Sequence, residues 1–305
     1  MKSIPESEII EVVKQRGILT GSELSRELSA DVFSLWRSCR LATELCVRTF
    51  GRRYLRLDKG LENYARLSPS IMREFLTYTL VGMAEEDEVL DLKAKEREEE
   101  IRLVSRSKHD LAYDIASEAM AQIAATRDVE DRVCFIIAGD VVFDMAHTEP
   151  RPEKSTGKMV RGSDLDLIVV YEDDLAEEIV QELDRAFYER KYLLLVHPLY
   201  REELDYIIKP LSKVKQQVAF DNFAHMVACK ILDEGRMLTG SKELFGCIKR
   251  LLDDNDIPSR LSEMEDRARA RRDEAEHILL GHPGQLTSPE FDQLFYYREE
   301  ADEIF

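Results

Sequence analysis

Two short runs of apolar residues constrain the fold of this chain most strongly. The run Val133–Ala138 ends at Gly139, and a second run, Leu165–Tyr171, is interrupted only by Asp166. Runs of this length and composition predict strands that are covered on both faces of a sheet. Most other periodic segments have helical spacing, so the sequence predicts an α+β fold in which helices flank a central mixed sheet.

The segments around these two runs predict the rest of the sheet. We expect a short helix to start near residue 141, a polar loop over 148–161 and a helix over 173–190. Two more strands are expected over 192–196 and 204–208. From residue 214 onward every periodic segment has helical spacing, which predicts a helical C-terminal region.

The N-terminal part predicts a different arrangement. Helices are expected over 6–16, from a cap at Thr20 to residue 28, and from a cap at Asp31 to about residue 45. Residues 47–57 alternate around Gly51, as a strand pair with a tight turn would. This order of elements resembles a winged helix-turn-helix domain.

Charge divides the chain in the same way. Residues 1–83 carry 13 Lys and Arg against 10 Asp and Glu, whereas the other 222 residues carry 30 against 51. We therefore expect a winged-helix-like domain over 1–83, an acidic linker and long helix over 84–127, a core over 128–213 and a helical region over 214–305. Only the first of these parts has the charge to approach DNA; it could equally bind a protein partner.

Several classes of protein are not supported. The chain lacks an apolar run of about 18 residues and an apolar N-terminal signal, so we expect no membrane partner and a cytoplasmic location. Its five cysteines form no C-x-x-C pair, which argues against a zinc site and a disulfide framework. The glycine-rich signatures of P-loop and Rossmann proteins are also missing.

A pair of carboxylates carries the most informative chemistry. Asp164 and Asp166 stand at the start of the second apolar run, and alternation along a strand directs both to the same face. Like charges on one face repel each other, and a divalent cation relieves this repulsion. Oxygen ligands favour Mg²⁺, and two such ions can activate an attacking oxygen and stabilise a leaving pyrophosphate.

A third carboxylate completes this pattern. Asp205 lies in the otherwise apolar strand expected over 204–208, where a lone carboxylate is costly unless it is paired or binds metal. A D-x-D on one strand and a single Asp on its neighbour predict Asp164, Asp166 and Asp205 as both catalytic residues and metal ligands.

At these residues the chain resembles the DNA polymerase beta-like nucleotidyltransferase superfamily. The resemblance covers about residues 128–213 and rests on the first strand with Gly139, the segment Gly162-Ser163 and the D-x-D that follows. It implies a transferase that moves a nucleoside monophosphate from an NTP to a hydroxyl acceptor. ATP is the expected donor, and two Mg²⁺ ions are the expected cofactors. The resemblance also implies that Gly139 and Ser163 contact the nucleotide.

Two departures from the superfamily pattern bear on nucleotide binding. Asp140 stands where members carry Ser or Gly, and an acid there would repel a triphosphate. The gap between Gly139 and Asp164 is also longer than usual. The inserted segment is basic, so we expect Lys154, Lys158 and Arg161 to supply phosphate contacts.

Three functions remain open from the sequence. The first is a magnesium-dependent nucleotidyltransferase whose acceptor is a protein, an RNA or a small molecule. The second is a DNA-binding regulator whose transferase-like domain senses nucleotide or is inert, which Asp140 and the basic residues of 37–59 would favour. The third is a protein-interaction module.

Overall fold

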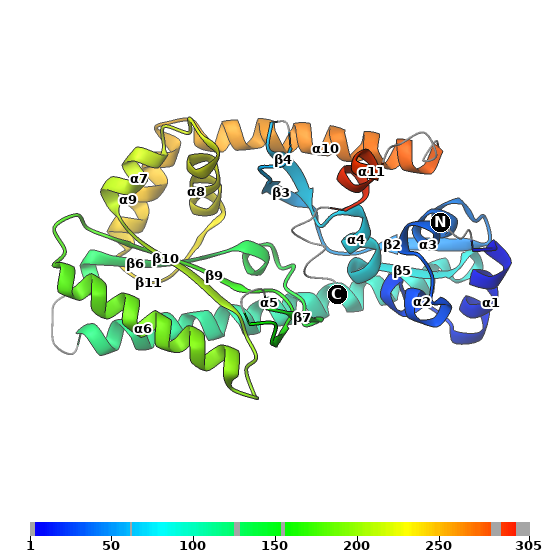
Figure 1. Cartoon of the computed structure of the whole chain (residues 1–305), viewed down its shortest axis with the longest axis horizontal. Helices are drawn as coiled ribbons and strands as arrows, with labels where there is room; N and C mark the ends of the chain where they lie inside the picture. Colours follow the sequence, from blue (N-terminus) through cyan, green and yellow to red (C-terminus); the bar gives the residue numbers. More distant parts are fainter. Residues whose placement is uncertain (1–3, 62, 125–128, 154–155, 282–287, 297–305) are drawn as a thin grey trace. The chain divides into compact units, whose positions relative to one another are not determined.

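The chain folds into two compact units. The computed structural model describes residues 4–61, 63–124, 129–153, 156–281 and 288–296 (Figure 1). The first unit contains Met1–Arg56, Ala65–Glu100 and Glu265–Phe305, and the second contains Leu57–Tyr64 and Ile101–Met264. The first unit therefore differs from the expected domain over 1–83, because it includes residues from the C-terminal end of the chain.

The first unit combines helices with two small sheets. A three-stranded antiparallel sheet has the order β1-β5-β2, and β3 pairs with β4. Its helices and strands are α1 (Glu6–Arg16), β1 (Leu19–Thr20), α2 (Gly21–Leu28), α3 (Val32–Leu41), β2 (Leu45–Thr49), β3 (Tyr54–Leu57), β4 (Ala65–Ser68), α4 (Ile71–Tyr78), β5 (Thr79–Met83), α5 (Asp87–Ala124), α10 (Ile257–Gly281) and α11 (Ser288–Phe295). Of these, β3, α5 and α10 continue into the second unit.

The predicted N-terminal helices are confirmed, and the predicted strand pair is wrong. Gly17 ends α1, and Thr20 caps α2 in a capping box with Glu23. Strands β2 and β3 both exist, but β2 pairs with β5 instead of β3. The turn at Gly51 suggested a local hairpin, and burial of β5 in the sheet instead favoured the non-local pairing.

The core of the first unit explains why it includes C-terminal residues. Trp36 on α3 is buried and packs against Phe33 and against Phe295 of α11. Leu279 of α10 belongs to the same apolar cluster. Burial of these aromatic and aliphatic side chains joins the two ends of the chain into one core.

The second unit is built on a four-stranded mixed sheet in the order β10-β9-β6-β11. Strands β9 and β10 are parallel, whereas β6 is antiparallel to both β9 and β11. Its remaining elements are β6 (Val133–Ala138), the 3₁₀ helix η3 (Gly139–Phe143), β7 (Pro150–Pro152), β8 (Met159–Arg161), β9 (Leu165–Tyr171), α6 (Glu177–Val196), β10 (Leu204–Pro210), α7 (Leu211–Gln217), α8 (Phe223–Glu234), β11 (Arg236–Gly240) and α9 (Lys242–Asp253).

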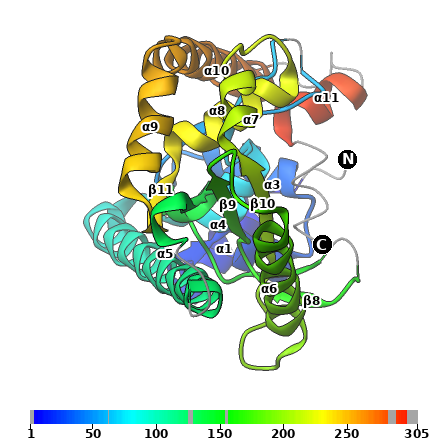
Figure 2. The same ribbon diagram turned by 90° about the vertical axis from the view of Figure 1, so that its left-hand side faces the viewer.

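Helices cover both faces of this sheet, as the buried runs predict. The second half of α5 and the length of α6 pack with Phe135, Leu167 and Leu204 in one core (Figure 2). Helices α7, α8 and α9 contact the other face. Because the faces alternate along each strand, Asp166 and Asp205 lie on the side of α7–α9.

Three local predictions for the second unit are wrong. Residues 192–196 continue α6 instead of forming a strand, because no helix breaker occurs before Pro198. The expected loop over 148–161 contains the two-stranded hairpin β7–β8. The expected all-helical region contains β11, which pairs with β6 along the edge of the sheet.

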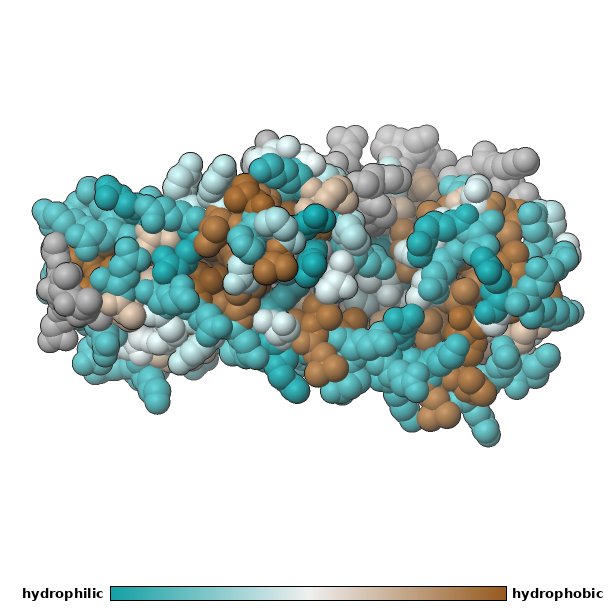
Figure 3. Space-filling view, turned by 90° about the horizontal axis from the view of Figure 1, so that it is seen from below, coloured by the Kyte–Doolittle hydropathy of each residue, from teal (hydrophilic) through white to brown (hydrophobic). Residues whose placement is uncertain are grey.

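The surface of the molecule is mixed. Figure 3 shows hydrophobic residues in separate patches among hydrophilic ones on the face that it presents. No helix among the described residues is long and apolar enough to cross a membrane.

Candidate active site

The acids predicted from the sequence meet at one end of β9 and β10. Asp166 and Asp205 are direct register partners on these adjacent parallel strands, and Ala138 of β6 is the partner of Asp166 on its other side. Asp164 directly precedes β9. Direct partners lie on the same face, and adjacent strands are about 4.7–4.9 Å apart, so the strand register places Asp205 beside Asp166 of the D-x-D.

A fourth carboxylate belongs to this group and was missed by the sequence analysis. Glu203 precedes β10 by one residue, and its carbonyl accepts a hydrogen bond of 2.9 Å from Leu165 N. Burial raises the pKa of Glu203, and the nearby carboxylates of Asp164 and Asp205 raise it further, against the lowering effect of Arg151. The sequence does contain a signal for Glu203, because Glu203 and Asp205 form an E-x-D with the same spacing as the D-x-D.

Two cations neutralise part of this negative charge. Arg151 of β7 is 5% exposed; its Nη1 lies 2.7 Å from Glu203 Oε2 and its Nη2 lies 4.0 Å from Asp164 Oδ2. Lys191 of α6 places its Nζ 2.6 Å from Asp205 Oδ1. The repulsion that the sequence predicts is therefore relieved in part by side chains of the chain itself.

Gly139 lies directly against the D-x-D. It has a φ of +72°, and a Cβ atom at this position would lie 2.2 Å from Asp166 Oδ2. Its backbone N–H donates a hydrogen bond of 3.2 Å to Glu234 Oε1 at the end of α8, and Lys230 pairs with the same Glu234 carboxylate. Only glycine fits here, and a phosphate that approached this N–H would have to displace Glu234.

Ser163 is engaged within the protein. Its Oγ donates a hydrogen bond of 2.7 Å to Asp140 Oδ2 and accepts one of 3.3 Å from His147 N, and the residue is 3% exposed. Gly162 precedes it with a φ of +60°, where a Cβ atom would clash with His147 O. Asp140, which departs from the superfamily pattern, thus has a positioning role: it fixes the turn that leads into β9.

The basic insert is divided between buried and exposed residues. Lys158 and Arg161 are exposed, whereas Lys154 lies outside the described residues. Arg161 and Arg201 both line a surface hollow of about 410 Å³ beside the β7–β8 hairpin. An anion can therefore contact Lys158, Arg161 and Arg201. Arg151 is buried and is not available to it.

The carboxylates do not form a ready metal site. Within the part of the chain that the structure describes, no three Asp, Glu, His or Cys side chains converge closely enough to hold an ion. The donor set nevertheless fits Mg²⁺, since it consists of carboxylate oxygens on adjacent strand ends. Binding would require Asp205 to exchange Lys191 for the ion.

The basic residues of the N-terminal part are largely engaged by carboxylates. Arg48 pairs with Asp87 and Asp91 at 2.6 Å. Arg53 places its Nε 2.6 Å from Glu74 and its Nη2 2.9 Å from Glu276. These internal ion pairs remove much of the positive charge that made a DNA partner attractive.

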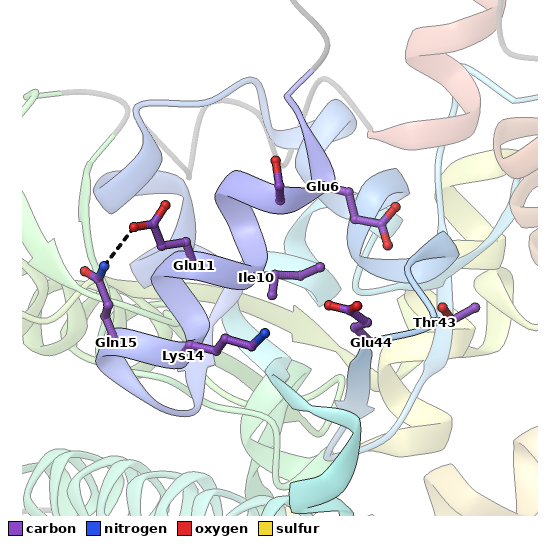
Figure 4. Close-up of a pocket in the computed structure, with 8 residues that line it drawn as sticks. Glu6, Ile10, Glu11, Lys14, Gln15, Thr43 and Glu44 are labelled. Atoms are coloured by element: carbon purple, nitrogen blue, oxygen red, sulfur yellow. Dashed lines mark hydrogen bonds between the residues drawn. The ribbon is translucent and has the colours of Figure 1, made fainter.

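A surface hollow of about 700 Å³ lies in the first unit, on α1 and the segment before β2 (Figure 4). It is lined by Glu6, Ser7, Ile10, Glu11, Lys14, Gln15, Thr43 and Glu44. The lining carries three Glu carboxylates and one lysine, and it has no buried polar group directed into it that would select a ligand. We assign it no role.

Comparison with known proteins assigns no family to the chain. No protein-family model matches it, and none of the curated proteins matches it at a significant level.

Proposed function

We propose that the second unit is a magnesium-dependent nucleotidyltransferase of the DNA polymerase beta-like type. It transfers a nucleoside monophosphate from an NTP, with ATP as the expected donor, to a hydroxyl acceptor. The observation that carries this proposal is the register pairing of Asp166 with Asp205. Asp164 lies two residues before Asp166, so the alternation of side chains places it on the same face. Acids placed in this way on adjacent strands fit the superfamily that the D-x-D segment resembles.

The order of the sheet supports the same proposal. The glycine turn follows β6, the D-x-D begins the neighbouring antiparallel strand β9, and the single acid begins β10, parallel to β9. The helix η3 starts at Gly139, so the turn faces the acids. Each predicted motif thus lies beside the others despite their separation in the sequence.

The residues of the chain divide the proposed reaction among them. Asp164, Asp166 and Asp205 would hold Mg²⁺, which when bound neutralises the negative charge of the phosphates. Asp205 also accepts the proton of the acceptor hydroxyl. Lys158, Arg161 and Arg201 are exposed beside the site and suit contacts to the leaving pyrophosphate.

The strand order of the first unit supports a winged-helix-like domain. Its elements follow the order α1, β1, α2, α3, β2, and β5 pairs between β1 and β2. Elements β3, β4 and α4 are inserted where a simple wing would be. Because its arginines are paired internally, we propose that this unit binds a protein partner in preference to DNA.

Pyrophosphate release tests the proposed reaction. The chain is incubated with each NTP, Mg²⁺ and a protein extract, and released pyrophosphate is measured beside the label transferred from the α-phosphate. We expect both products with at least one NTP, and neither with Asp166→Asn. Pyrophosphate release by wild type and variant at equal rates would contradict the assignment, as would the lack of any product with every NTP.

A further inference from the structure

Strand β10 is one of the two edge strands of the sheet. The sheet order places β9 on one side of β10 and no strand on its other side among the described residues (Figure 2). The backbone N–H of Leu165 donates a hydrogen bond to Glu203 O. Backbone direction alternates along a strand, so Glu203, Asp205 and every second residue after them direct their N–H and C=O groups toward β9. The intervening residues Tyr206 and Ile208 direct theirs outward.

The outer side of this edge is accessible and presents an apolar side chain on one face and a mixed polar and apolar hollow on the other. Ile207 is 55% exposed on the same face as Asp205, although most large apolar residues in the sheet are buried. On the α6 side, a hollow of about 540 Å³ is lined by Ile208 of β10 and by Glu177, Val180, Gln181, Asp184, Arg185 and Tyr188 of α6. Exposed edges usually carry charges or proline that prevent pairing, and β10 has these only at its two ends.

We propose that a segment of a partner protein adds to β10 as an extended strand and presents a Ser, Thr or Tyr hydroxyl beside Asp205. This inference rests on the proposed function and specifies its acceptor as a protein. A residue opposite Asp205 in an added strand has its Cβ about 4.5–5.5 Å away, on the face that holds Asp166 and Asp205.

The chemistry of the edge indicates which segment it prefers. Residues next to the hydroxyl point to the α6 side, where the hollow is lined by two carboxylates, Glu177 and Asp184, against one cation, Arg185. The excess of negative charge favours lysine or arginine at these positions. Residues two positions away lie on the face of Ile207 and favour an apolar side chain. The net charge of -18 disfavours a second copy of the chain as the occupant.

The transfer step conserves atoms and charge. The hydroxyl oxygen of the bound segment attacks the α-phosphorus of the NTP and forms a new P–O bond, while the bond to the β-phosphate oxygen breaks and pyrophosphate leaves. The hydroxyl proton passes to Asp205. Lys191 holds Asp205 in the absence of substrate and must release it for this step.

A defined peptide tests the docking surface by fluorescence anisotropy with the full chain. The probe is a fluorescein-labelled peptide, Lys-Val-Lys-Ser-Lys-Val-Lys, whose alternation fits the two sides of the edge. Ile208→Pro removes an outward N–H donor while it keeps the bonds to β9, and Ile208→Val is the matched control. We expect Ile208→Pro to weaken binding by about tenfold or more and the control to bind as wild type does.

The outcomes separate this inference from the proposed reaction. Equal binding by wild type and Ile208→Pro, or equal binding of a peptide in which proline replaces both valines and both lysines next to the serine, overturns the edge as a docking site. A wild-type dimer that Ile208→Pro makes monomeric also overturns it, because a second copy then occupies the edge. With ATP and Mg²⁺ added, binding without pyrophosphate release refutes the reaction alone, whereas release that is independent of the peptide refutes the protein acceptor alone.

Discussion

Arg151 is predicted to hold the candidate site together by charge. Its guanidinium is almost fully buried, with Nη1 2.7 Å from Glu203 and Nε donating to Gly162 O at 2.7 Å. Arg151→Met would leave the Glu203 carboxylate, itself 10% exposed, without its cation. Breaking a buried ion pair in this way costs about 3–5 kcal/mol, so we expect a loss of that size in the free energy of unfolding.

A double-mutant cycle in urea measures this effect. Glu203→Gln alone leaves the arginine without its anion, and Arg151→Met with Glu203→Gln removes both charges together. We expect the double variant to lose less than the sum of the single variants by about 2 kcal/mol or more. Additive losses, or a loss below about 1 kcal/mol in Arg151→Met, would refute the structural role of Arg151.

Acid should reduce the cost of Arg151→Met. Burial already raises the pKa of Glu203, and removal of the guanidinium that lowers it would raise the pKa further. A raised pKa in the folded state means that the folded variant binds a proton more readily than the unfolded chain as the pH falls. The difference in stability between wild type and variant should therefore shrink as the pH is lowered from 7 toward the ordinary Glu pKa of about 4.3.

Three further predictions follow from the same contacts. Burial lowers the pKa of Lys209 from 10.5 to about 8. Lys209→Met should therefore be more stable than wild type by about 2–3 kcal/mol in urea at pH 7, and equal to it near pH 10.5. A difference in stability that does not change with pH would contradict this. Arg53→Met should lower the melting temperature, because it breaks the pairs with Glu74 and Glu276, and should leave the affinity and salt dependence for duplex DNA unchanged; a flatter salt dependence would restore the DNA partner. Backbone amides of the β7–β8 hairpin should exchange more slowly with solvent deuterium when Mg²⁺ and a non-hydrolysable ATP analogue are added; unchanged exchange at saturation would exclude the hairpin from the phosphate site.

Local patterns were sufficient to predict two of the strands that meet at the candidate site. Strands β6 and β9 follow from apolar runs bounded by Gly139 and by the D-x-D, and both have the predicted bounds. The register that joins Asp166 to Asp205 was expected only in outline, because pairing between strands is decided by the packing of both faces.

Non-local contacts account for what the sequence could not predict. The burial of Arg151 against Glu203 depends on the β7–β8 hairpin, where the sequence predicted a polar loop. The pairing of Lys191 with Asp205 required residues 192–196 to continue α6, whereas a strand was expected there. That segment is apolar throughout, which suggested a buried strand, but three of its five residues are leucine and continue the helix that covers the sheet.

Calorimetric titration of ATP in the presence of Mg²⁺ tests the central proposal most directly. Wild type, Asp166→Asn and Asp174→Asn are compared, with and without the metal; Asp174 is exposed and pairs with Arg132, away from the D-x-D. We predict binding that requires Mg²⁺ in wild type and in Asp174→Asn, and its loss in Asp166→Asn while the fold persists. Binding that is independent of Mg²⁺, or equal in all three proteins, would contradict the account.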